Sequence, residues 1–115
     1  MAQKDILIKN FKEYYDLAEY AFKNKKYNGA VTLYHKALVE LCDLSLLESS
    51  GKVGVNHIER FNLLRVNNPK LYEIASKLFG FYRDSYSNNI SETIAKEVRQ
   101  RVADARRQII KETNT

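Results

Sequence analysis

Apolar residues recur at three- and four-residue steps along most of the chain, which is the spacing of one face of an α-helix. Four glycines and one proline leave little material for the turns of a many-stranded sheet. The pattern therefore predicts an all-α fold, an up-and-down bundle of four long helices and one short helix. The expected helices cover residues 4–23, residues 27–49, a short stretch over residues 57–64, a fourth segment from Pro69, and a fifth capped by either Asn89 or Ser91.

Residues typical of helix ends stand at the expected boundaries. Gly51 follows the second helix, where glycine is a common C-terminal stop. Asn56 with Glu59 three residues later matches a capping box that begins the third helix. Asn68 followed by Pro69 is the arrangement preferred at the first positions of a helix. These signals predict where helices two, three and four begin or end.

The second helix has the widest apolar face, so we expect it at the centre of the fold, touched from two sides. We expect the first helix to pair with the second and the fourth with the fifth. Ser76 and Gly80 lie four residues apart, off the core stripe of the fourth helix. Because glycine inside a helix costs about 1 kcal/mol relative to alanine, we expect another helix to approach closely there. The predicted core stripe of the fourth helix is Leu71, Ile74, Ala75, Leu78, Tyr82 and Tyr86.

The length of 115 residues predicts one domain, spanning residues 1–115, with a single core. Cys42 is the only cysteine and sits among leucines, so we expect a buried thiol and no intramolecular disulfide. The first ten residues carry charges where a signal peptide needs an apolar run, and no stretch approaches the roughly 20 apolar residues of a membrane span. We therefore expect a cytoplasmic protein.

Positive charge is unevenly distributed along the chain. Acidic and basic residues balance in residues 1–50, so residues 51–115 carry the whole net charge of +5 and all seven arginines. Arginine binds phosphate in a bidentate manner, which favours an anionic partner. A basic surface that is merely solvated has the same composition, so both interpretations stay open.

Few signatures of metal or cofactor chemistry are present. One cysteine and two histidines far apart in the sequence do not match a zinc motif, and the glycines form no phosphate-binding loop, so we expect no metal and no cofactor. His35 is expected to be a partly exposed helix residue. His57 and Arg60, one turn apart in the third helix, either present a small basic spot or have an ordinary structural role, and both interpretations stay open.

Arg83 is the residue with the most evident functional potential. It lies near the end of the fourth helix beside Asp84, with Tyr86 about one turn further on. One interpretation is a surface salt bridge. The other is that Arg83 points into a cleft and binds a phosphate or a developing negative charge. The periodicity of the chain does not decide between them.

Residues 17–41, LAEYAFKNKKYNGAVTLYHKALVEL, resemble a tetratricopeptide hairpin, with characteristic small and aromatic residues along both of its helices. The pattern appears once, whereas a solenoid needs several stacked copies. A tetratricopeptide-like adaptor for protein–protein interaction is therefore an alternative interpretation of the chain.

A second resemblance covers nearly the whole chain. Two long helices come first, with Tyr27-Asn28-Gly29-Ala30 starting the second; a short helix with His57 and Phe61 follows; and Leu71-Tyr72 through Tyr82-Arg83-Asp84-Ser85-Tyr86 precedes the last helix. In this order the chain resembles the HEPN superfamily of small prokaryotic helical-bundle proteins. The resemblance implies a helical bundle that dimerises. Many members are ribonuclease toxins of toxin–antitoxin pairs or partners of a nucleotidyltransferase.

The resemblance also implies roles for residues near Arg83. Active members carry an arginine and, four to six residues later, a histidine that acts in RNA cleavage. Arg83 matches the arginine, but Asn88, Asn89 and Ile90 occupy the positions of the histidine. Asparagine does not shuttle a proton near neutral pH, which general acid–base cleavage requires.

We therefore expect a homodimeric HEPN-like module, non-catalytic or weakly catalytic, that binds RNA or a nucleotide or partners a nucleotidyltransferase. An active ribonuclease is a further alternative, in which His57 approaches Arg83. Ser76 and Gly80 are the candidate dimer contacts. The candidate residues for binding RNA or another anion are Arg83, Tyr86, Asn88, Asn89, His57 and Arg60.

Overall fold

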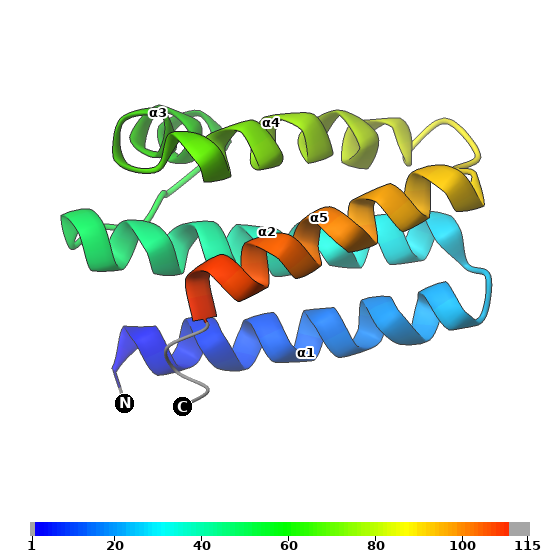
Figure 1. Ribbon diagram of the computed structural model, residues 1–115, viewed down its shortest axis with the longest axis horizontal. Coiled ribbons are helices and arrows are strands. Elements are labelled where there is room, and N and C mark those ends of the chain that lie inside the picture. The colour runs from blue at the N-terminus through cyan, green and yellow to red at the C-terminus, as the bar shows by residue number, and fades with distance from the viewer. Residues whose placement is uncertain (1, 111–115) are drawn as a thin grey trace.

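A computed structural model of the chain describes residues 2–110, and the prediction of an all-α fold is confirmed (Figure 1). No strand occurs among these residues, and none of their helices is long and apolar enough to cross a membrane. Residues 1 and 111–115 of the predicted domain lie outside the described residues. The helices are α1 (Gln3–Lys23), α2 (Tyr27–Ser50), α3 (His57–Asn67), α4 (Pro69–Asp84) and α5 (Glu92–Ile110).

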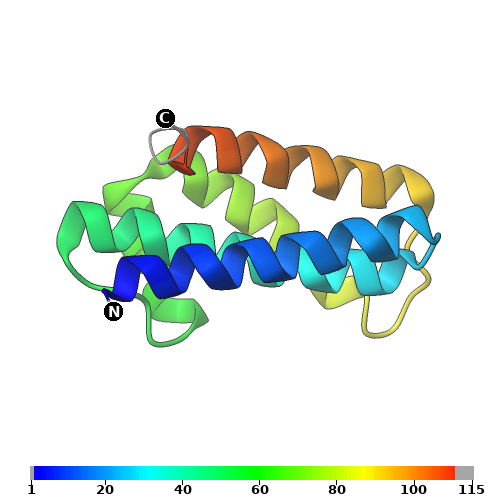
Figure 2. The ribbon, with the colours of Figure 1, turned by 90° about the horizontal axis from the view of Figure 1, so that it is seen from below.

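Helix α2 is the centre of the fold, as its wide apolar face predicts. It contacts all four other helices. In Figure 1, α1 and α4 flank α2 on its two sides while α5 crosses one face, and Figure 2 places α3 on the side away from α5. The predicted pair of α1 with α2 is confirmed. The predicted pairing of α4 with α5 is only partly right, because α5 packs mainly on α2 and more lightly on α4.

Local capping residues set most of the helix ends. Gly51 ends α2 in the left-handed conformation, with φ of 74°, which glycine adopts without steric cost. The Asn68 side chain accepts a hydrogen bond of 3.1 Å from the backbone N–H three residues on, with Pro69 in the first helical position. Ser91, rather than Asn89, caps α5 by the same type of bond at 3.2 Å. Sequence and structure agree closely at these points.

The third helix is longer than the pattern predicts. Its cap is as expected, because the Asn56 side chain accepts from the Glu59 N–H at 2.9 Å. The Glu59 carboxylate accepts a hydrogen bond from the Val55 N–H at 3.1 Å. In a usual capping box it would accept from the N–H of the capping residue itself, which here is Asn56. The helix then continues to Asn67, three residues beyond the predicted end.

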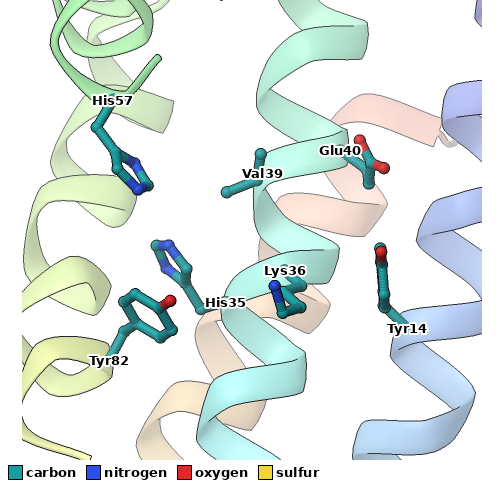
Figure 3. A pocket seen from close by; sticks show the side chains of 7 residues that line it. All are labelled: Tyr14, His35, Lys36, Val39, Glu40, His57 and Tyr82. Atoms are coloured by element: carbon teal, nitrogen blue, oxygen red, sulfur yellow. The ribbon is translucent and has the colours of Figure 1, made fainter. Parts of the chain in front are cut away.

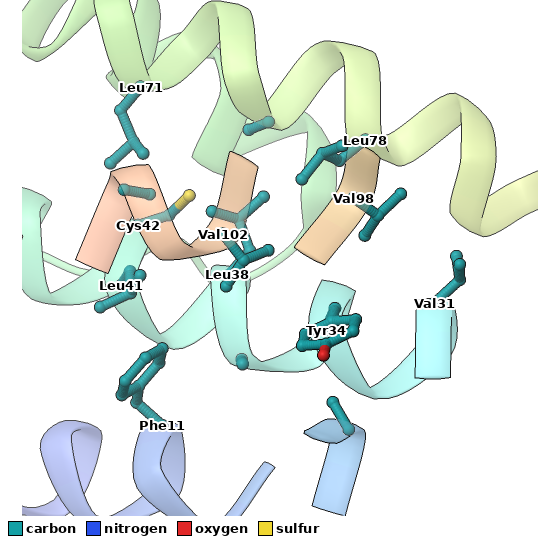
Figure 4. Close-up of a cluster of buried hydrophobic side chains, with 14 of the residues drawn as sticks. Phe11, Val31, Tyr34, Leu38, Leu41, Cys42, Leu71, Leu78, Val98 and Val102 are labelled. Atoms are coloured by element: carbon teal, nitrogen blue, oxygen red, sulfur yellow. The ribbon is translucent and has the colours of Figure 1, made fainter. Parts of the chain in front are cut away.

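The core forms where α2 meets α1, α4 and α5 (Figure 4). Cys42 is buried there as predicted, and burial raises the pKa of its thiol to about 12. Tyr86 is not part of this core. Its predicted place on the core stripe of α4 is wrong, because the helix ends at Asp84 and the side chain is 75% exposed. Large side chains that are fully buried include Phe11, Tyr34, Leu38, Leu41, Leu71, Leu78 and Val98.

No described helix approaches the face of α4 that carries Ser76 and Gly80. Ser76 is exposed, and a Cβ placed on Gly80 meets no atom within 4 Å. The close contact expected at Gly80 is therefore absent within residues 2–110, and a dimer contact at this face stays a prediction.

Candidate functional site

A pocket of about 220 Å³ opens on α2, between α1 on one side and α3 and α4 on the other (Figure 3). It exists because α5 covers the opposite face of α2, which leaves this face of the central helix partly uncovered. Its lining combines rings with groups of both charges. The lining residues are Tyr14, His35, Lys36, Val39, Glu40, His57 and Tyr82.

His35 forms the inner wall of this pocket. The expectation of a partly exposed residue is wrong, because the side chain is only 5% exposed. Its ring stacks on Tyr82, with centroids 4.0 Å apart and planes 13° apart, and Phe79 lies 5.8 Å away. The helical spacing of the sequence could have predicted this burial. His35 stands three or four residues from Val31 and Leu38, in one row along α2 that continues to Cys42, and all of these residues are buried. Tyr82 of α4 packs on this row at His35.

Neither ring nitrogen of His35 has a hydrogen-bond partner among the described residues. The pKa of this imidazole is lowered to about 4, chiefly by burial and in addition by the nearby charges of His57, Arg60 and Lys36. The ring is therefore neutral at pH 7, with one N–H donor and one nitrogen acceptor unused. An unsatisfied buried polar group costs about 1–3 kcal/mol, and such groups in native proteins call for an explanation.

The fold brings the two histidines together although they are far apart in the sequence. Their ring centroids lie 6.0 Å apart, with His57 exposed at the start of α3. Among residues 2–110 no group of three or more histidine, cysteine, aspartate or glutamate side chains is placed to hold a metal ion. What the pair offers to a ligand is hydrogen-bonding ring nitrogens and ring faces for stacking.

Arg83 lies beside the same cluster of rings. Its guanidinium carbon is 5.7 Å from the centroid of the Phe79 ring, and His57 packs on that ring at 5.0 Å. Arg83 is exposed and forms no ion pair with any described residue. Within residues 2–110, the surface salt bridge that the sequence allows is therefore not formed, and no described carboxylate neutralises this charge.

Arg60 is engaged elsewhere. Its guanidinium donates to both carboxylate oxygens of Asp43, at 3.0 and 3.2 Å, and to the Gly54 carbonyl at 3.2 Å. Gly54 has to be glycine, since a Cβ there would lie 2.6 Å from the Arg60 Cβ. Both charged side chains are about nine-tenths buried. Arg60 therefore anchors the loop before α3, which does not fit the anion-binding role expected for it.

Three further candidate residues follow the end of α4. The Tyr86 hydroxyl lies 2.7 Å from the Tyr82 hydroxyl, and their rings are 5.4 Å apart. The rings of His57, His35, Tyr82 and Tyr86 thus form a continuous row, which we call the aromatic strip. Asn88 and Asn89 are exposed in the turn beyond it.

Asn28, in the first turn of α2, fixes this turn. Its amide nitrogen donates to the carbonyls of Ser85, at 2.9 Å, and Asn88, at 2.8 Å, and its amide oxygen accepts from the Ile90 N–H at 2.9 Å. We expect Asn28→Asp to lower the free energy of unfolding by about 2–3 kcal/mol, because a carboxylate oxygen then faces two carbonyl oxygens. Urea denaturation measures the change.

The matched control is Asn62→Asp on the exposed face of α3, where the same substitution should change the free energy of unfolding by less than about 0.5 kcal/mol. Equal effects at the two positions would show that Asn28 does not hold the turn.

No family model matches the chain, and comparisons with curated proteins and with solved structures find no match either. A function therefore has to be inferred from the chain's own geometry.

Proposed function

We propose that this chain is a HEPN-like, non-catalytic helical module that binds a nucleotide, free or within RNA, along the aromatic strip and the adjacent Arg83. The observation that carries the proposal is His35. Its imidazole is buried in the wall of a pocket, stacked on Tyr82, with both nitrogens free of partners among the described residues.

The residues around His35 supply the chemistry that a nucleotide requires. Exposed rings of Tyr86 and His57 offer faces on which bases stack, and each such stack is worth about 1–3 kcal/mol. The unpaired guanidinium of Arg83 can hold a phosphate through two parallel hydrogen bonds. A neutral imidazole with one donor and one acceptor complements the donor and acceptor pattern of a base edge.

Charges at the mouth of the pocket fit a mixed polar ligand. Lys36 is exposed there, next to Glu40, whose pKa burial raises above its ordinary value. A purely anionic ligand would meet the Glu40 carboxylate, whereas a base with amino and carbonyl groups can pair with either side chain. The proposal therefore places the base at the pocket and the phosphate at Arg83.

Catalysis is not part of the proposal. Cleavage of RNA without a metal needs groups that give and accept protons near neutral pH. His35 stays neutral down to about pH 4, and Asn88 and Asn89 replace the histidine that the HEPN resemblance would require. Partnership with a nucleotidyltransferase, which the resemblance also implies, is compatible with a module that binds nucleotides.

The test is binding of a fluorescently labelled single-stranded RNA, followed by anisotropy over a series of salt concentrations. We expect Arg83→Ala to weaken binding about tenfold and to reduce the slope of log K against log salt by about 1, since one phosphate contact is lost. The control is Arg107→Ala, which removes the same charge from an exposed position on α5.

Two further measurements sharpen the test. Tyr86→Ala should weaken binding and Tyr86→Phe should not, because the ring and not the hydroxyl stacks on a base. Intact RNA after incubation with concentrated protein separates binding from cleavage. Absence of binding by the wild type, salt-insensitive binding, or equal losses in the two arginine variants contradicts the proposal.

A further inference from the structure

Glu40 is a partly buried carboxylate in the pocket lining that forms no ion pair with any residue in the range 2–110. Burial raises the pKa of Glu40, a hydrogen bond with Asn10 lowers it, and the charges of Asp43 and Arg60 raise and lower it respectively. Asp43 and Arg60 pair with each other, so their effects on Glu40 are opposed. An ionised carboxylate is an acceptor only, with room for several hydrogen bonds. Glu40 can therefore still accept from a ligand that carries N–H groups.

Lys36 stands one helical turn before Glu40 on α2, and its exposed side chain lines the same pocket (Figure 3). Its ammonium group forms no ion pair with a described carboxylate, Glu40 included. The Cβ atoms of residues four apart on a helix are about 5–6 Å from each other, so one ligand edge can contact both side chains. Lys36 offers donors only and Glu40 acceptors only. Together they complement an edge that has an acceptor next to N–H donors.

The position of this pair determines which edge of a nucleotide it meets. At 3.6 residues per turn, the α2 residues of the lining follow one another around the helix in the order His35, Val39, Lys36 and Glu40. Figure 3 shows His35 on the side of α4 and Glu40 towards α1. The phosphate is proposed to lie at Arg83, on α4. The Watson–Crick edge of a base points away from its sugar and phosphate, and so towards Lys36 and Glu40.

We propose that the base bound in this pocket is guanine, with Glu40 accepting from N1–H and the N2 amino group while Lys36 donates to O6. The assignment rests on the proposed function, because that function sets the direction in which the base enters. Guanine is the base whose Watson–Crick edge has two adjacent N–H donors beside a carbonyl oxygen. Adenine, cytosine and uracil each offer the carboxylate one donor on that edge. Lysine is also a common partner of the guanine O6 atom.

An arginine side chain from a partner protein is the other ligand group that presents two parallel N–H donors to a carboxylate. A guanidinium bound to Glu40 would bring a second positive charge close to Lys36, whose own charge no described carboxylate neutralises. Guanine is neutral and gives Lys36 an acceptor. The charges of the pocket therefore favour the base over the cation.

Competition between mononucleotides tests the assignment. GMP, IMP, AMP, CMP and UMP are each used to displace the labelled single-stranded RNA, and calorimetry of GMP gives a second measurement that does not depend on RNA. All five share the same sugar and phosphate, so differences between them arise from the base. We expect GMP to act at a concentration about tenfold lower than AMP, CMP or UMP. IMP lacks the N2 amino group and should lie between GMP and AMP.

Three variants locate the preference. Glu40→Gln keeps the shape of the side chain but replaces one acceptor by an N–H₂ donor, so the preference for GMP over AMP should fall below about threefold. Lys36→Met should weaken GMP more than AMP, because it removes the donor to O6. The matched control is Glu73→Gln, at an exposed position on α4 outside the pocket lining, which should keep the wild-type preference. Circular dichroism confirms that each variant is folded.

The outcomes separate the assignment from the function on which it rests. If neither RNA nor GMP binds, the proposed function and the guanine assignment both fail. Mononucleotides that bind equally well, or a preference for GMP that survives Glu40→Gln, overturn the assignment and leave nucleotide binding in place. Displacement of RNA by argininamide more effectively than by GMP, lost in Glu40→Gln, also overturns it, because Glu40 would then select a cation.

Discussion

Replacing Asp43 by alanine is expected to lower the free energy of unfolding by about 3–5 kcal/mol, one of the two largest effects we predict for this chain. Asp43 lies in α2 and is 6% exposed. Its carboxylate accepts two hydrogen bonds from Arg60 and one, at 3.2 Å, from the Gly54 N–H. Without it, the guanidinium stays buried with no counter-ion and keeps only its bond to the Gly54 carbonyl, and the Gly54 N–H loses its acceptor. Chemical denaturation followed by circular dichroism measures the loss.

Two other variants test whether the loss of stability comes from the buried position of the Asp43 carboxylate or would follow the removal of any carboxylate. Glu48→Ala removes a carboxylate from the exposed pair with Lys4, 3.4 Å apart, and should cost less than about 1 kcal/mol. Asp43→Asn keeps the shape and one acceptor, so its effect should lie between those of the two alanine variants. If Asp43→Ala costs no more than Glu48→Ala, the ion pair does not anchor the loop before α3.

Those features of the fold that depend on neighbouring residues could be predicted from the sequence. The cap formed by Asn68 and Pro69 and the stop at Gly51 need only a few adjacent residues, because the side chain and the backbone group that it satisfies belong to the same turn. The wide apolar face of α2 likewise indicates a central helix, since each of its sides has to be covered.

The candidate site depends on contacts between distant segments, which is why only part of it was predicted. His57, Arg83 and Tyr86 were identified as candidates, but their connection through Phe79, Tyr82 and His35 arises only when α3 and α4 pack on α2. The partner of Arg60 lies on a different helix, α2. Periodicity locates a face of a helix and does not say which residue lies opposite.

The second large effect concerns pH. We expect the wild type to lose about 2–3 kcal/mol of stability between pH 7 and pH 4 through His35 alone. The pKa of His35 is about 4 in the folded chain, against an ordinary value of 6.5. Between these values the unfolded state binds a proton that the folded state does not. Stability is therefore highest above pH 6.5 and falls as the pH drops towards 4.

The variant His35→Phe isolates this contribution, because the carboxylates that titrate near pH 4 are the same in both proteins. The difference in unfolding free energy between variant and wild type should grow by about 2–3 kcal/mol from pH 7 to pH 4. Gln108→Ala, at an exposed position on α5 with no titrating group, should leave the wild-type dependence unchanged. A pH profile of His35→Phe identical to that of the wild type would contradict the burial of a neutral imidazole.

The same variant relates stability to the proposed function. Phenylalanine keeps a ring against Tyr82 and removes two unpaired buried nitrogens, so His35→Phe should be more stable than the wild type at pH 7, by about 1 kcal/mol. If the imidazole pairs with a base, the variant should also bind RNA more weakly. Higher stability with weaker binding is the pattern of a residue kept for a ligand at a cost to the fold. Unchanged binding would assign His35 to packing and leave Arg83 and the exposed rings as the binding groups.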